Sequence, residues 1–198
     1  PFSNIKAFLI LITVICLLTG CKKKVANKKA PQPSAETLFS LLPSEKTGIN
    51  FSNTLTESAT ANVLTYQYFY NGGGVAIGDI NNDGLQDIYF YGNMTPNRVY
   101  LNKGNFKFED ITQVAGVTGK EYAWKTGVTR ADVNGDGRQD IYVCYSGNMP
   151  EESRINQLFI NQGNNSSGEP VFKDMAVDFG LGFPSFSTQA YFFDYDRD

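Results

Sequence analysis

The chain has 198 residues, of which 41% are hydrophobic and 19% charged, a composition typical of a globular protein and not of a disordered one. It contains no histidine, which excludes Ser-His and Cys-His nucleophile pairs and the usual imidazole metal site. The first 33 residues hold six of the 17 basic residues and none of the 20 acidic ones, so the remainder, with 11 basic and 20 acidic residues, is not expected to bind nucleic acid.

The first 20 residues are predicted to be a signal peptide. Residues 7–18 form an apolar run that is too short to span a bilayer as a helix. Leu18-Thr19-Gly20-Cys21 closes this run and resembles the lipobox of bacterial lipoproteins, although an ordinary signal peptide or a piece of membrane helix would also be apolar. The resemblance implies that Cys21 becomes a lipid-modified terminus. It places the protein in the bacterial cell envelope, on the outer membrane.

A flexible linker is expected for residues 21–47, because the stretch is rich in Lys and Pro and lacks apolar periodicity. Its lysines could touch anionic lipid headgroups, or they could simply be solvated. Among the three cysteines only Cys144 lies beyond this region, so no intramolecular disulfide is available. Cys144 is predicted to be a small buried side chain.

The rest of the chain is organised by a repeat. The segment GGVAIGDINNDGLQDIYFYGN (73–93) matches TGVTRADVNGDGRQDIYVCYSGN (126–148), and a third copy begins at STQAYFFDYDRD (187–198). The similarity continues through residues 97–104 and 156–163, and through residues 108–112 and 172–176. The extra length of the second unit falls in polar inserts, as expected of surface loops.

Each unit contains four short apolar runs separated by Gly, Asn and Asp, which predicts four strands. In the first unit the runs are residues 75–80, 87–91, 98–101 and 107–111. Tandem four-stranded units are typical of all-β proteins built from β-propeller blades of antiparallel strands. The first run is the least polar, and a propeller's innermost strand is buried on both faces.

We predict that residues 48–198 form part of a propeller, with blades at about 72–115 and 124–180 and a third beginning at about 186. Residues 48–55 resemble a fourth strand without its first three, as expected of the strand that closes a ring. These units make an incomplete ring with unpaired edges. The chain is therefore expected to be an amino-terminal fragment.

Acidic clusters stand between the first and second runs of each unit. Oxygen ligands at alternate positions 1, 3 and 5 of a tight loop can converge on a hard cation, with a glycine at 6, a backbone carbonyl at 7 and an oxygen at 9. Two full copies and a truncated third make solvated hairpin turns a poorer explanation. The predicted ligands are Asp79, Asn81, Asp83, the Leu85 carbonyl and Asp87; Asp132, Asn134, Asp136, the Arg138 carbonyl and Asp140; and Asp194, Asp196 and Asp198.

All-oxygen ligands favour Ca²⁺ over zinc or copper, and also over Mg²⁺, which prefers to keep its waters. EF-hands and dockerin-like loops need an acid at position 12 and flanking helices, whereas Phe90 or Val143 stands there in a β-rich run. Nonapeptide calcium rolls need a Gly-rich repeat every nine residues, and residues 71–79 give only one loose copy. The sequence therefore predicts calcium bound in a loop between two strands.

The run VAIGDINNDGLQDIY (75–89) and its second copy resemble FG-GAP/VCBS repeats, which also form integrin α-subunit propellers. LNKG (101–104), FEDIT (108–112) and AGV (115–117) are similar to bacterial proteins that join such repeats to a terminal ASPIC/UnbV domain. The resemblance implies a seven-bladed propeller with Ca²⁺ between the first and second strands of its blades. Asn at position 3 departs from the usual Asp and removes one charge from each site.

Aromatic residues precede each innermost run, in residues 66–70, 122–124 and 183–186, and they could either recognise a sugar or peptide or pack between blades. The predicted function is a non-catalytic, calcium-binding, lipid-anchored propeller that binds a protein or glycan ligand in adhesion. The alternative is a polysaccharide-degrading propeller that uses paired carboxylates. Outside the loops, however, the acids considered for that chemistry form no recognisable constellation: Glu109, Asp110, Glu121, Glu151 and Glu152.

Overall fold

The structure is a computed structural model that describes residues 38–196. The predicted signal peptide, the proposed lipidation site Cys21 and the last predicted ligand, Asp198, lie outside the described residues. Residues from Leu42 onward form one compact unit, and the architecture below is that of this unit. None of the helices between residues 38 and 196 is long and apolar enough to cross a membrane.

The first of two antiparallel sheets has the order β1-β2-β3-β4. Its strands are β1 (Gly74–Gly78), β2 (Asp87–Tyr91), β3 (Arg98–Asn102) and β4 (Phe108–Asp110). The four predicted runs of the first unit are therefore confirmed as strands. Turn residues set their limits: Gly84 and Gly104, at φ of 86° and 79°, hold left-handed backbone in the connecting loops.

The second sheet repeats this order as β5-β6-β7-β8. Its strands are β5 (Trp124–Ala131), β6 (Asp140–Ser146), β7 (Gln157–Asn164) and β8 (Pro170–Asp174). The 3-10 helix η1 (Glu151–Arg154) lies in the first polar insert. The described residues also include two short helices, α2 (Ser44–Thr47) and α3 (Thr112–Ala115). Two four-stranded antiparallel sheets confirm the all-β, blade-like class predicted from the repeat.

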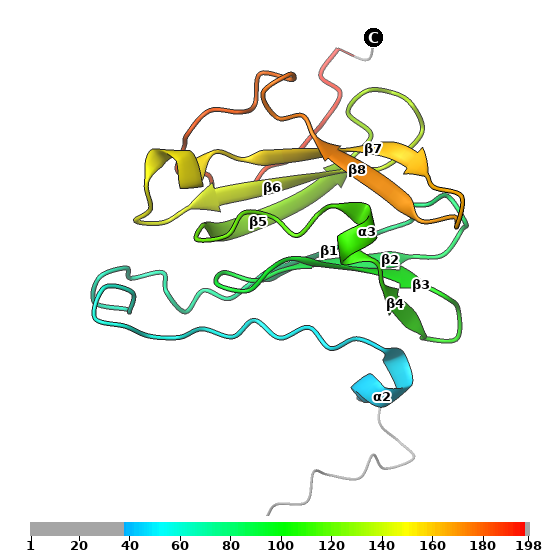
Figure 1. Ribbon diagram of the computed structural model, residues 1–198, viewed down its shortest axis with the longest axis horizontal. Coiled ribbons are helices and arrows are strands. Elements are labelled where there is room, and N and C mark those ends of the chain that lie inside the picture. The colour runs from blue at the N-terminus through cyan, green and yellow to red at the C-terminus, as the bar shows by residue number, and fades with distance from the viewer. Residues whose placement is uncertain (1–37, 197–198) are drawn as a thin grey trace, which may run out of the picture. The chain divides into compact units, whose positions relative to one another are not determined.

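The two sheets pack face to face, as Figure 1 shows. Alternation along β2 directs Tyr89 and Tyr91 toward the second sheet, since both are buried while the alternate residues Ile88 and Phe90 are only half-buried. Tyr89 joins a single core cluster with Val99 of β3 and with residues of the second sheet. The main core therefore lies between the blades.

The segment 48–58 runs along the face of the first sheet that is turned away from the second (Figure 1). Phe51 stacks on Phe90 with ring centroids 4.9 Å apart, and the backbone N–H of Asn50 donates to the Tyr100 hydroxyl at 3.3 Å. This segment contains no strand, and its predicted role in closing a ring stays a prediction.

The innermost strands of the two blades differ in burial. Residues 187–190 lie beside β5, where the Thr126 hydroxyl donates to the Ser187 carbonyl at 2.6 Å. By contrast, Val75 and Ile77 of β1 are 50% and 51% exposed, so the expected burial of both faces is wrong for this strand. The reason is that no segment between residues 38 and 196 covers that side of β1.

Residues 186–196 form no strand in the part of the chain that the structure describes. A strand exists only when a neighbour pairs with its backbone, and no second strand of a third unit lies among these residues. Asp194 and Asp196 consequently belong to no formed loop, and the third cation site stays a prediction.

Candidate metal-binding loops and an aromatic pocket

The first acidic loop, between β1 and β2, is wound around the carboxylate at its position 1. Asp79 accepts hydrogen bonds from the backbone N–H groups of Asp83 at 3.1 Å and Gly84 at 2.8 Å. Asp83 in turn accepts from the N–H of Leu85 at 2.8 Å and from the side-chain amide of Asn81 at 2.9 Å. Positions 1, 3 and 5 are therefore gathered in one turn.

The second loop, between β5 and β6, repeats this geometry. Asp132 accepts from the N–H of Asp136 at 3.1 Å and of Gly137 at 2.8 Å, and Asn134 donates to Asp136 at 3.0 Å. The N–H of Gly137, the strongest of these influences, lowers the pKa of Asp132 because it stabilises the ionised carboxylate. Two loops 53 residues apart thus share one hydrogen-bonded frame.

The carboxylate at position 9 of the first loop is buried. Asp87 is 1% exposed, and it accepts from the N–H of Asn102 at 2.8 Å and of Ile80 at 3.0 Å. Burial, with smaller contributions from the charges of Asp83 and Asp79, raises its pKa to about 6 against the opposing effect of these two hydrogen bonds. A cation beside this carboxylate would relieve that unfavourable charge.

Asp140 is the carboxylate at position 9 of the second loop. It is fully buried and accepts from the N–H of Asn161 at 2.8 Å and of Val133 at 3.0 Å. Its pKa is also raised, chiefly by burial. Position 9 therefore joins each loop to the third strand of its own blade.

Sequence reasoning missed the role of an asparagine in the third strand of each blade, Asn102 in β3 and Asn161 in β7. The side chain of Asn161 donates to the Ile80 carbonyl at 2.8 Å and accepts from the N–H of Gly163 at 2.9 Å. Asn102 likewise accepts from the N–H of Gly104 at 2.8 Å. The signal was the repeated Asn-x-Gly of residues 102–104 and 161–163.

The two loops differ at position 7. Leu85 stands there in the first loop, whereas Arg138 in the second donates from its guanidinium to the Asp136 carboxylate at 2.5 Å and to the Asn161 carbonyl at 3.1 Å. This ion pair places a positive charge on a predicted ligand. A cation entering the second loop must compete with it.

Between residues 38 and 196, no three His, Cys, Asp or Glu side chains come together in an arrangement that could hold a metal ion on their own. In the first loop, both carboxylate oxygens of Asp79 and of Asp87 accept hydrogen bonds from backbone N–H groups. A carboxylate has about four acceptor positions, so each retains capacity for a cation. The predicted set also uses an Asn oxygen and a backbone carbonyl, and its donor chemistry fits a hard cation such as Ca²⁺.

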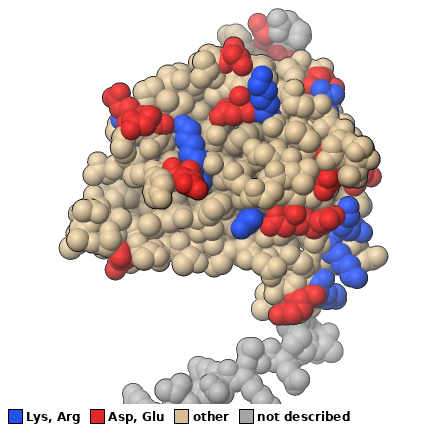
Figure 2. Space-filling view, viewed as in Figure 1, with Lys and Arg blue, Asp and Glu red and all other residues tan. Residues whose placement is uncertain are grey.

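Several acids considered for paired-carboxylate chemistry take part in ion pairs. Glu109 pairs with Lys103 at 3.1 Å and Asp110 with Arg98 at 3.4 Å. Figure 2 shows acidic and basic side chains interspersed over the face that it displays. No observation on these acids favours the enzyme alternative.

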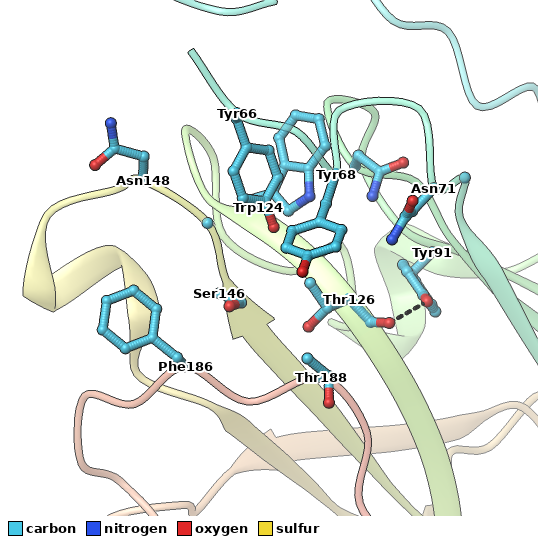
Figure 3. Close-up of a pocket in the computed structure, with 13 residues that line it drawn as sticks. Tyr66, Tyr68, Asn71, Tyr91, Trp124, Thr126, Ser146, Asn148, Phe186 and Thr188 are labelled. Carbon is cyan, nitrogen blue, oxygen red and sulfur yellow. Dashed lines mark hydrogen bonds between the residues drawn. The ribbon is translucent and has the colours of Figure 1, made fainter. Parts of the chain in front are cut away.

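A pocket of about 660 Å³ lies where the three aromatic segments meet. Tyr66, Tyr68, Trp124 and Phe186 line it, together with Tyr91 and small polar residues (Figure 3). The Tyr91 hydroxyl donates to the Thr126 carbonyl at 2.6 Å and fixes one wall. The aromatic segments therefore surround a hollow and do not merely pack between blades.

Residues 79–143 and 132–198 both match the family of the FG-GAP-like repeat. The chain belongs to this family. Each match begins at the position-1 aspartate of an acidic loop, Asp79 or Asp132. FG-GAP repeat domains are β-propeller-type binding modules that are generally non-catalytic and often bind protein ligands.

The FG-GAP repeats of this chain are also similar to a eukaryotic protein, cartilage acidic protein 1 of Xenopus tropicalis. The two are 35% identical over 131 residues, which is 65% of this chain and 19% of the relative. The chain thus corresponds to about a fifth of that relative's length.

Proposed function

We propose that this chain is part of a calcium-binding, lipid-anchored propeller of the bacterial cell envelope that binds a protein or glycan ligand without catalysing a reaction. The observation that carries the proposal is the duplicated loop frame, in which Asp79 and Asp132 are wrapped by backbone N–H groups in the same way. A hairpin turn alone would not require the same hydrogen-bonded frame, with the same acidic residues, in both blades.

Calcium in these loops would act on stability. An ion that binds the folded state alone stabilises it by mass action, by about 1.4 kcal/mol per loop when free calcium is tenfold above the Kd. Two loops would contribute about 3 kcal/mol, a rise in Tm of roughly 5–10 °C.

The test is thermal unfolding of the protein in EDTA and in increasing calcium. We expect Tm to rise with calcium in the wild type and to be nearly constant in the double variant Asp79→Asn and Asp132→Asn, which removes a ligand charge from each loop. Glu109→Gln is the matched control, because Glu109 is an exposed acid outside the loops. A wild-type Tm that is the same in EDTA and in millimolar calcium would refute the calcium proposal.

The proposed anchor depends on Cys21 and is tested separately. In cells grown with a terminal-alkyne fatty acid, the wild type should carry the alkyne label and Cys21→Ser should not. The wild type should also fractionate with the outer membrane. Equal labelling of the two proteins would exclude lipidation at this residue.

A further inference from the structure

The lining of the aromatic pocket has a distinct chemical character. None of its lining residues is charged. Tyr68 and Phe186 are 51% and 72% exposed, so ring surface remains open to a ligand. The volume of about 660 Å³ lies within the range of small-molecule sites, roughly 300–1,000 Å³.

Polar groups with unused hydrogen-bonding capacity stand around these rings. The side chains of Asn71, Ser146, Asn148 and Thr188 make no hydrogen bond within residues 38–196. Ser146 differs from the other three, because it lines the pocket although the residue is only 6% exposed. Its hydroxyl oxygen is not itself buried, so it is open to a hydrogen bond with a ligand or water in the pocket.

The rings on one side of the pocket are held in place by packing. Tyr66 contacts Tyr68 at 5.7 Å and Trp124 at 5.3 Å between ring centroids, both edge to face. Phe69, which is 1% exposed, supports Trp124 from behind at 5.3 Å. Such fixed rings lose little conformational entropy when a ligand binds.

The ring on the other side is Phe186. The Arg154 guanidinium lies over it at 4.0 Å from the centroid, and Arg154 is itself tied to the Met149 carbonyl at 3.1 Å. Figure 3 shows the Phe186 ring and the rings of Tyr66, Tyr68 and Trp124 on opposite sides of Ser146 in that view. Two ring surfaces thus flank an uncharged polar floor.

We propose that this pocket binds a neutral saccharide. The C–H faces of a pyranose ring pack on aromatic rings, and its hydroxyls can exchange hydrogen bonds with amides and with the Ser146 and Thr188 hydroxyls. None of the lining residues could pair with a charged sugar or peptide side chain. Arg154, which lies over Phe186 from outside the lining, already contacts the Met149 carbonyl and the Glu151 carboxylate. The inference narrows the ligand class within the proposed function and rests on it.

The test is a titration of the calcium-loaded protein with neutral hexose oligosaccharides and with uronic-acid oligosaccharides of equal length. The fluorescence of Trp124 reports on the pocket directly, because it is the one tryptophan among the 198 residues. We expect neutral sugars to change it, Tyr68→Ala and Phe186→Ala to weaken binding about tenfold each, and Ser146→Ala to weaken it several-fold.

The matched control is Tyr122→Gly, which removes a ring that is 87% exposed and lies outside the pocket, at a backbone φ of 52° that glycine accepts. It should bind like the wild type. Binding of uronic-acid sugars alone, of peptides from a displayed library but no sugar, or of sugars equally well by Tyr68→Ala would overturn the inference. A calcium-dependent Tm without saccharide binding would overturn only this inference, whereas loss of the calcium effect would count against the proposed function.

Discussion

Lys125 of β5 gives the sharpest stability prediction, because it is a charged side chain buried without a counterion. It is 2% exposed, it makes no ion pair within residues 38–196, and its ammonium donates to the Thr95 carbonyl at 3.1 Å. Burial lowers the pKa of Lys125 from 10.5 to about 8. The perturbation is Lys125→Met, which keeps a long side chain and removes the charge.

The magnitude follows from the two pKa values. Below pH 8 the lysine is protonated in both states, and the folded state carries the full cost of burying the charge. Between pH 8 and 10.5 the unfolded chain binds more protons than the folded one, so the free energy of unfolding rises with pH. The difference of 2.5 between the pKa values corresponds to about 3 kcal/mol.

The assay is urea unfolding of wild type and Lys125→Met at steps between pH 7 and 10.5, with the difference in unfolding free energy plotted against pH. Groups that titrate alike in both proteins cancel in this difference. We expect the variant to lose about 3 kcal/mol of relative stability across that range. Lys103→Met, a change at an exposed lysine paired with Glu109, is the control. A difference for Lys125→Met that varies by less than about 1 kcal/mol would refute the reasoning.

Three further predictions concern the second blade. Arg138→Leu should tighten calcium binding about two- to fivefold in titration calorimetry, because it removes an exposed ion pair with Asp136; unchanged affinity would contradict competition. Asn161→Ala should lower the free energy of unfolding by about 2–3 kcal/mol in urea, since the Ile80 carbonyl loses its donor; a loss under 0.5 kcal/mol would count against this contact. Cys144, 1% exposed with a pKa raised by burial to about 11, should react with a thiol reagent at pH 8 only as the protein unfolds; rapid labelling of the folded protein would contradict it.

The blades were predictable because their signals are local. Short apolar runs between Gly, Asn and Asp marked strands such as β2 and β3, and the duplication removed most of the ambiguity of each single run. The burial of Cys144 followed from its apolar neighbours in β6 and is confirmed. Such features depend only on residues within one hairpin.

Features that depend on how the blades stack were not predictable. The contact of Asn161 with Ile80 spans 81 positions and requires the twist of both sheets. Lys125 follows Trp124 in a strand whose apolar and polar residues do not alternate regularly. From the sequence alone, a lysine at this position would be expected to be exposed. The aromatic segments were foreseen, but the inward turn of Phe69 beside the exposed Tyr68 lies in an irregular segment without periodicity.

The position of the first acidic loop links metal binding to the junction between blades. Residues of the second blade hold this loop from outside: Asn164 donates to the Asn81 carbonyl at 2.9 Å, and Asn82 donates to the Gly137 carbonyl at 3.2 Å. A cation that orders the first loop would therefore also stabilise the contact with its neighbour. Each blade adds one such loop, so calcium would stabilise every contact between blades at which the pattern recurs. Calcium would then stabilise the whole propeller and not only the individual hairpins.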